Sequence, residues 1–176
     1  VVYRSGIALR NAVSSLNQAQ SRGIQIRYLT NNASRTPEQV AANLQGFGLD
    51  VEIEAVITSA MTIARVMREQ LDPGSTVYVV GAWGLEIALE SEGLFPTRDP
   101  NRDISAVVQG HSPETTWGDL AEAGHLISSG VPWYASNTDA SIPTGRGLAP
   151  GNGAFVRLLQ ELTGLTPTVA GKPHIP

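Results

Sequence analysis

Short apolar segments alternate with helical patterns along the whole length of this chain. The segments at residues 76–80 and 106–109 are typical, because each is rich in valine and is followed by a stretch with helical spacing. Strands that alternate with helices indicate a parallel sheet with helical connections. The sequence therefore predicts an α/β fold, with further strands at residues 24–29, 55–58, 133–136 and 168–170.

The helical patterns carry recognisable start signals. Thr36 is placed to cap a helix, with Pro37 at its first position and Gln39 three residues after the cap. Ser59 is expected to cap the helix that follows the strand at residues 55–58. Further helices are predicted at residues 8–20, 83–92, 117–129 and 154–163.

Charge and composition narrow the range of partners. The net charge is −4 and no run of Lys or Arg occurs, so the chain lacks the electrostatic footprint of a nucleic-acid or membrane binder. We expect a small-molecule partner, no nucleic acid and no membrane. The absence of cysteine excludes disulfides and thiolate metal sites. No apolar run approaches the roughly 20 residues of a membrane span, so a cytoplasmic location is expected. The oligomeric state, a homo-oligomer included, stays open.

Polar residues follow the predicted strand at residues 24–29. In an open α/β sheet, ligands bind beyond the carboxyl ends of the strands, which is where Thr30, Asn31 and Asn32 stand. A threonine hydroxyl and the backbone N–H groups of a tight turn can donate together to an anion such as phosphate. The alternative is an Asx-type turn in which the amides bond only to their own backbone.

Lys172 stands between Gly171 and Pro173, after the last predicted strand. Its small neighbour would let the ammonium approach a buried anion, whereas the alternative is an ordinary exposed lysine. One strand end offers hydroxyl and amide donors and the other offers positive charge. Together they would form the two halves of a phosphate site.

The loop at residues 137–153 is the longest polar segment. Asn137 and Asp139 can contact a ligand from it, or they can simply form the loop. Residues 150–153 precede a helix and could hold an anion there, but a plain turn explains them with fewer assumptions.

Two other patterns do not support a site. The sequence GAWGLE at residues 81–86 lacks the third glycine and the acidic partner of a dinucleotide fingerprint. A nucleotide-binding domain that uses Gly81 and Gly84 is kept as a weaker hypothesis. The three histidines share no ligand spacing, so no transition-metal site is expected.

Five short segments occur in a fixed order: LTNNASRTP, VITSA, ASNTDASIPT, PGNGAFV and AGKP. In order and separation they resemble the haloacid dehalogenase-type phosphatases of class IIA, the NagD-like and nitrophenylphosphatase group, over the entire chain. The resemblance implies a Rossmann-like parallel core with an inserted α/β cap domain. Residues 1–71 would be the first part of the core, residues 72–167 the cap and residues 168–176 the return to the core, consistent with the turn signal at Asp72-Pro73-Gly74.

The resemblance also implies an activity. In this family an aspartate attacks the phosphorus of a monoester to form a phosphoaspartyl enzyme, a second aspartate protonates the leaving group, and Mg²⁺ offsets the negative charge. Thr30 and Lys172 would be the catalytic residues, with Asn31 donating its backbone N–H to the phosphoryl group. Asn32 would lie at the phosphate, and Asn137 and Asp139 would face the active site from the cap.

The sequence departs from the family pattern in its carboxylates. It has no Asp-x-Asp-Gly motif and no metal-binding Gly-Asp segment after the lysine motif. We therefore expect an internal part of a Mg²⁺-dependent phosphatase, inactive by itself, with the nucleophile and the Mg²⁺ ligands outside this chain. The alternative is a non-catalytic α/β module that binds phosphoryl ligands through Thr30 and Lys172.

Overall fold

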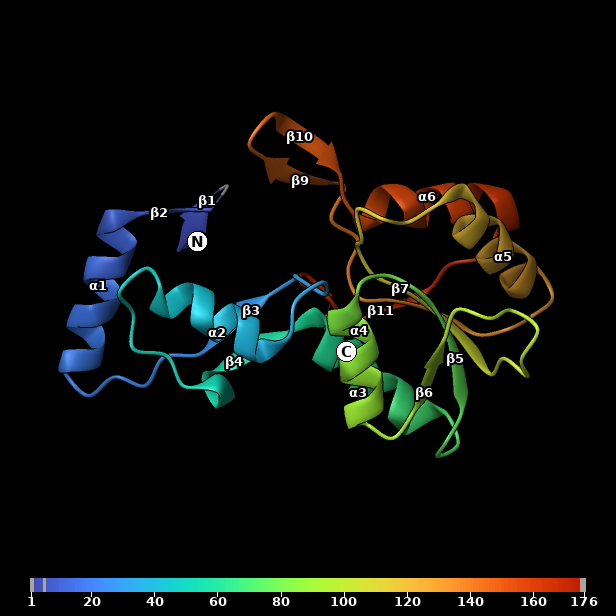
Figure 1. Cartoon of the computed structure of the whole chain (residues 1–176), viewed down its shortest axis with the longest axis horizontal. Coiled ribbons are helices and arrows are strands. Elements are labelled where there is room, and N and C mark those ends of the chain that lie inside the picture. The colour runs from blue at the N-terminus through green and yellow to red at the C-terminus, as the bar shows by residue number, and fades with distance from the viewer. Residues whose placement is uncertain (1, 5, 175–176) are drawn as a thin grey trace.

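The computed structural model describes residues 2–4 and 6–174. They form two separate parallel sheets, which lie on either side of the middle of the molecule's long axis (Figure 1). The smaller sheet pairs β3 (Tyr28–Thr30) with β4 (Val56–Thr58). The larger sheet has five strands in the order β11-β8-β7-β5-β6, and all of its pairings are parallel. The predicted α/β fold with parallel strands is confirmed.

The smaller sheet is covered by the first third of the chain. A hairpin of β1 (Tyr3–Arg4) and β2 (Ile7–Ala8) leads into α1 (Arg10–Ser21). Along the chain, β3 is followed by α2 (Pro37–Gln45) and by the short 3₁₀ helix η1 (Ile53–Ala55), which leads into β4. The predicted start of α2 is confirmed, because the Thr36 hydroxyl accepts from the Gln39 N–H while the Gln39 side chain accepts from the Thr36 N–H. The core of this unit contains Tyr28, Val40, Ala41, Leu44, Leu49, Val51, Ala55 and Val56.

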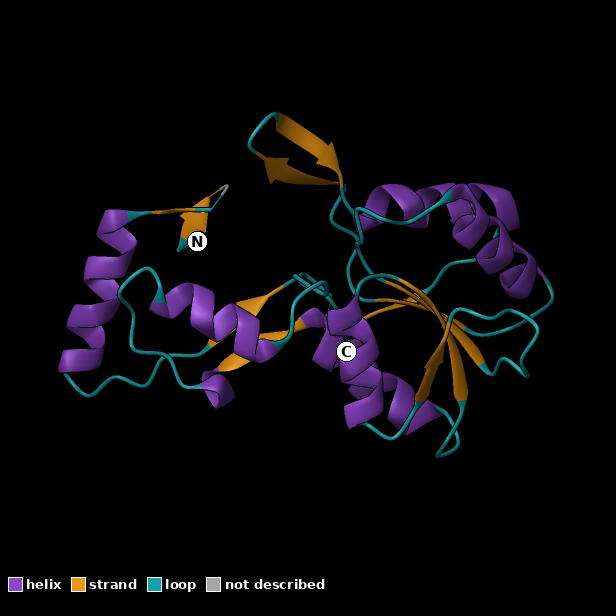
Figure 2. Ribbon diagram, viewed as in Figure 1, coloured by secondary structure: helices purple, strands orange, loops and turns teal. Residues whose placement is uncertain are grey.

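The larger sheet has helices on both of its faces (Figure 2). Its strands are β5 (Thr76–Val80), β6 (Phe95–Thr97), β7 (Ala106–Gln109), β8 (Trp133–Ala135) and β11 (Thr168–Val169). Helices α3 (Ser59–Gln70) and α4 (Trp83–Ser91) pack on one face, and α5 (Trp117–Ser128) and α6 (Asn152–Thr163) pack on the other. Side chains alternate along β5, so Val77 and Val79 face α3 and α4 while Tyr78 and Val80 face α5 and α6.

Several predicted bounds are wrong. Residues 24–27 are not in a strand, because β3 begins at Tyr28, where its pairing with Val56 begins. The long polar loop contains an antiparallel hairpin of β9 (Ser141–Thr144) and β10 (Gly147–Pro150). Ser59 does not cap α3. The cap is Thr58, whose hydroxyl accepts from the Met61 N–H at 3.2 Å, and the Ser59 hydroxyl points elsewhere.

The division of the chain at residues 71/72 and 167/168 stays a prediction. The packing adds two observations that bear on it. Helix α3 buries Ile63 and Met67 in the same core as Val77 and Val79 of the larger sheet. Strand β11 pairs with β8 at the edge of that sheet. By these contacts, α3 and β11 both belong to the five-stranded unit. The sequence-based division instead assigns them to the Rossmann-like core domain.

None of the helices in the described ranges combines the length and the apolar character that crossing a bilayer requires.

Candidate active site

A cavity of about 1040 Å³ opens where β3 ends. Residues between 2 and 44 line one side of it, and the loop after β8 and the β9–β10 hairpin line the other. All the residues that the sequence singled out for a site border this cavity, although they come from three distant segments: Thr30, Asn31, Asn32, Asn137, Asp139 and Lys172. The structure therefore brings the predicted set together in one place.

Lys172 reaches the end of the smaller sheet. Its ammonium Nζ donates to the backbone carbonyl of Leu29 at 2.9 Å, so the positive charge lies beside Thr30. The residue is exposed, but the ammonium is held by this bond instead of extending freely into solvent. The cation and the Thr30 hydroxyl consequently border the same part of the cavity.

The side-chain amide of Asn31 pairs with the backbone of Lys172. Its Oδ1 accepts from the Lys172 N–H at 2.9 Å and its Nδ2 donates to the Lys172 carbonyl at 3.0 Å. The same Nδ2 also donates to Oδ1 of Asp139 at 3.0 Å. One amide therefore connects the end of β3 to two segments that lie 108 and 141 residues further along the chain.

Asn32 shapes the turn itself. Its Oδ1 accepts from the backbone N–H of Ser34 at 2.8 Å and of Arg35 at 3.1 Å, which is an Asx-type turn. Its own backbone N–H donates to Oγ1 of Thr30 at 3.1 Å. The Asx-type turn, which was the alternative for residues 30–32, is therefore what Asn32 forms. The Asn31 side chain instead bonds to distant segments.

Asn137 is buried against this turn, with 4% of its surface exposed. Its Nδ2 donates to the carbonyl of Asn31 at 2.8 Å, and its Oδ1 accepts from the Asp139 N–H at 3.1 Å. Asn152, at the start of α6, donates in turn to the Asn137 carbonyl at 2.7 Å. The loop after β8 is therefore fixed from both sides.

The glycines of residues 150–153 have a packing role. Gly153 donates its N–H to the Asp139 carbonyl at 2.9 Å, and a Cβ at Gly153 would collide with the Thr138 carbonyl. A Cβ at Gly151 would collide with the Asp139 carbonyl. The turn and helix start expected for this segment fit these contacts.

Gly84 has a similar explanation. A Cβ at Gly84 would lie 2.7 Å from the backbone nitrogen of Arg35, so the first turn of α4 rests directly on the loop that follows Asn32. This close approach accounts for Gly84 without a bound nucleotide.

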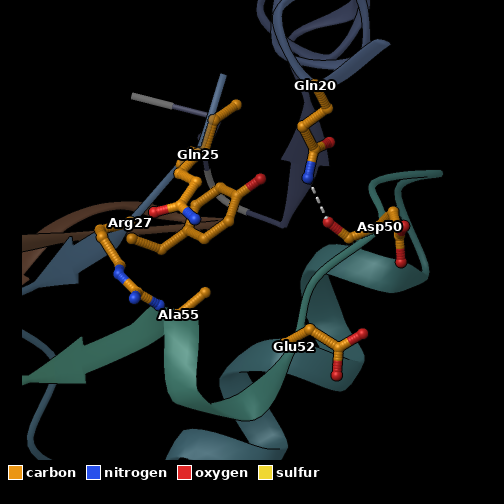
Figure 3. Close-up of a pocket in the computed structure, with 8 residues that line it drawn as sticks. Gln20, Gln25, Arg27, Asp50, Glu52 and Ala55 are labelled. Atoms are coloured by element: carbon orange, nitrogen blue, oxygen red, sulfur yellow. Dashed lines mark hydrogen bonds between the residues drawn. The ribbon is translucent and has the colours of Figure 1, made fainter. Parts of the chain in front are cut away.

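A second cavity, of about 210 Å³, lies beside the start of β3 (Figure 3). Gln20 donates to the Asp50 carbonyl at 2.6 Å at its edge. The buried Tyr28 hydroxyl has no hydrogen-bond partner among residues 2–4 and 6–174, and burial, with Asp50 nearby, raises the pKa of Tyr28. None of the predicted site residues lines this cavity, so the larger one is the candidate active site.

A comparison with known families shows which family the chain belongs to. A model of the haloacid dehalogenase-like hydrolases matches residues 1–95, more than half of the chain. The chain belongs to this family. The expected membership in its class IIA phosphatases is confirmed, because the similar proteins are named phosphatases.

The D-glycerol 3-phosphate phosphatase of Mycobacterium tuberculosis is 46% identical over 162 residues, which are 92% of this chain and 45% of the relative. The acid sugar phosphatase of Staphylococcus aureus is 40% identical over 173 residues, 98% of the chain and 66% of the relative. A solved structure of the mycobacterial glycerol phosphate phosphatase in complex with magnesium superposes with a TM-score of 0.92 at 43% identity, covering 98% of this chain and 52% of that one. The chain thus spans about half to two thirds of the length of these relatives.

The described residues of this chain do not by themselves form a magnesium site. Within the described ranges, no group of three or more His, Cys, Asp or Glu side chains is arranged to hold a metal ion. Asp139 is the only carboxylate among the described residues that line the cavity. Mg²⁺ prefers several oxygen ligands in octahedral geometry, which one carboxylate does not supply.

Sequence reasoning missed several residues of the site. His111 lines the cavity, and burial lowers the pKa of its imidazole. Ser59 donates to the Asn31 carbonyl at 2.7 Å, and residues 142–145 of the β9–β10 hairpin border the cavity. Ser59 had a usable signal, because it directly follows a strand end. His111 and the hairpin residues had none, because their place depends on how the smaller unit packs against the five-stranded unit.

Proposed function

We propose that this chain supplies the phosphate-binding part of a phosphatase that hydrolyses small phosphate monoesters. The observation that carries the proposal is the bond from Lys172 Nζ to the Leu29 carbonyl at 2.9 Å, which puts a cation beside the Thr30 hydroxyl on one cavity. A phosphate dianion needs both charge and directed donors, and this strand end offers both. The names of the relatives support the same activity.

Each residue has a distinct task in this proposal. The Thr30 oxygen already accepts from the Asn32 N–H, so its own hydrogen is available for a phosphoryl oxygen. The backbone N–H of Asn31 donates to another phosphoryl oxygen. Lys172 offsets the charge of the dianion, and it does so more strongly once the cavity excludes water. Asn137 and Asp139 face the leaving group from the loop after β8.

The nucleophile and the metal belong to the proposal for the whole protein. We propose that an aspartate outside this chain attacks the phosphorus, forming a phosphoaspartyl intermediate, and that Mg²⁺ is the cofactor, as the mycobacterial complex with magnesium suggests. The ligands of the ion would also lie outside this chain, so its own residues bind and orient the phosphoryl group. A small phosphate ester in the cytoplasm is the proposed substrate.

Turnover by the complete gene product tests the proposal. With Mg²⁺ present, it should hydrolyse p-nitrophenyl phosphate and lose that activity when EDTA is added. This chain alone should bind orthophosphate without turnover. Orthophosphate binding by the chain, combined with an inactive complete gene product, would instead favour the non-catalytic binding module. Absence of both would remove the proposed phosphate site altogether.

A further inference from the structure

The carbonyl oxygen of Asn31 accepts two hydrogen bonds from side chains of different elements. Ser59, the first residue of α3, donates its hydroxyl at 2.7 Å. Asn137, in the loop after β8, donates Nδ2 at 2.8 Å. Both donors are buried, with 3% and 4% of their surface exposed. Because a carbonyl oxygen has two lone pairs, these two bonds saturate it.

The peptide group between Asn31 and Asn32 is therefore held at both of its polar atoms. Its oxygen is fixed by Ser59 and Asn137, and its N–H, which belongs to Asn32, donates to Thr30 Oγ1 at 3.1 Å. A peptide group is planar, so a bond at one end fixes the direction of the group at the other. The Ser59 hydroxyl is thus linked to the Thr30 hydroxyl through one rigid unit.

The helix does not need the Ser59 hydroxyl. The first turn of α3 is already capped by Thr58, whose oxygen accepts from the Met61 N–H. Ser59 is buried, with 3% of its surface exposed, and it is not among the described residues that line the cavity. The one described hydrogen bond of the Ser59 hydroxyl is to the Asn31 carbonyl, which belongs to the turn at the phosphate site.

We propose that Ser59 is a positioning residue for phosphate binding. Its hydroxyl, together with the Asn137 amide, holds the Asn31–Asn32 peptide so that the Asn32 N–H occupies one lone pair of Thr30 and the Thr30 O–H points into the cavity. This inference rests on the proposed function and deepens it, because it adds a buried residue that acts on the anion only through the backbone of the turn.

Orthophosphate affinity of this chain tests the inference, since it requires no turnover. Ser59→Ala should weaken orthophosphate binding about three- to tenfold, the effect of losing one hydrogen bond that orients a donor. It should also speed hydrogen exchange at the Asn32 amide in particular. A merely structural role for Ser59 would not single out this amide. Thr62→Val is the matched control, because Thr62 donates a comparable bond to the Thr58 carbonyl at 3.1 Å from the same helix turn without touching Asn31. It should change neither quantity.

A second variant protects the test against misfolding. Ser59→Cys is close to serine in size but is a weak donor, so it should lower the affinity in the same direction as Ser59→Ala. The role of Ser59 would be overturned if Ser59→Ala and Ser59→Cys bound orthophosphate as tightly as Thr62→Val. It would also be overturned if the wild-type chain did not bind orthophosphate. An inactive complete gene product, with these binding effects intact, would instead count against the proposed hydrolysis alone.

Discussion

Lys172 Nζ donates a hydrogen bond to the carbonyl of Leu29, although 143 residues separate the two along the chain. This bond places the cation at the end of β3, the strand that runs directly into Thr30. Lys172 is also the only lysine in the sequence. The cation of the proposed phosphate site can therefore be changed or observed without interference from any other lysine side chain.

Replacing the cation should weaken anion binding. Lys172→Met should raise the dissociation constant of orthophosphate about tenfold or more, because a hydrogen bond to a charged group contributes about 1.5–3 kcal/mol. The measurement is isothermal titration calorimetry on the chain. Arg157→Met removes one positive charge from an exposed position of α6 and should leave the constant within about twofold of wild type, the range of a screened surface charge. Equal losses in both variants would mean that only overall charge matters.

The Asn31 amide should contribute to stability as well as to the site. Asn31→Ala removes its bonds to Lys172 and Asp139 and should lower the free energy of unfolding by about 1–3 kcal/mol. Urea denaturation provides the measurement. Asn17→Ala, which removes one exposed bond to the Gly48 carbonyl, should cost less than about 1 kcal/mol. A loss at position 31 no larger than at position 17 would contradict the linking role of Asn31.

Two Trp-Gly pairs at helix starts offer a matched test of the contact between α4 and the turn. Gly84→Ala should destabilise the chain by about 1–3 kcal/mol, because its Cβ would lie 2.7 Å from the Arg35 nitrogen. Gly118→Ala, at the same position of α5, meets only Thr116 Oγ1 at 3.5 Å and should be neutral or stabilising by up to about 1 kcal/mol. The measurement is thermal unfolding of the two variants. Equal changes in stability would contradict the close approach of Gly84 to Arg35.

The half-buried His111 should make stability depend on pH. Burial lowers the pKa of folded His111 below 6.5, so between the two pKa values the unfolded chain binds more protons than the folded one. The free energy of unfolding should therefore fall as the pH is lowered through 6.5 toward the folded pKa. His111→Gln removes this contribution, so its stability should fall less steeply than that of wild type. Denaturation curves at pH 7.5, 6.5 and 5.5 provide the test, and parallel profiles would rule the effect out.

Much of the fold could be predicted because its signals are local. The strands Thr76–Val80 and Ala106–Gln109 match their predicted bounds, and the capping box of Thr36 and Gln39 marks the start of α2 correctly. The hairpin of β9 and β10 was missed because its strands are exposed, contain proline and lack a clear apolar alternation. Ser59 was misassigned because Thr58, one residue earlier, is an equally good capping residue.

The candidate site was predictable residue by residue but not as a network. Thr30 and Lys172 both follow apolar strands, which is a local signal for a ligand site in an α/β sheet. The bond from Asn137 to the Asn31 carbonyl spans 106 residues and leaves no trace in sequence spacing. Asn137 was predicted at the substrate, and that role stays a prediction. Its amide donates to Asn31 in the structure, which no local pattern indicates.

Whether Thr30 and Lys172 bind one phosphate together can be measured with the single lysine as a probe. With ¹³C-labelled lysine, the Cε resonance of Lys172 can be followed by NMR while orthophosphate is added to the chain. A shared site should give a saturable shift whose affinity falls about tenfold in Thr30→Val and is retained in Thr30→Ser, which keeps the hydroxyl donor. A Lys172 resonance that does not respond to orthophosphate, or that responds with the same affinity in Thr30→Val, would contradict the shared site.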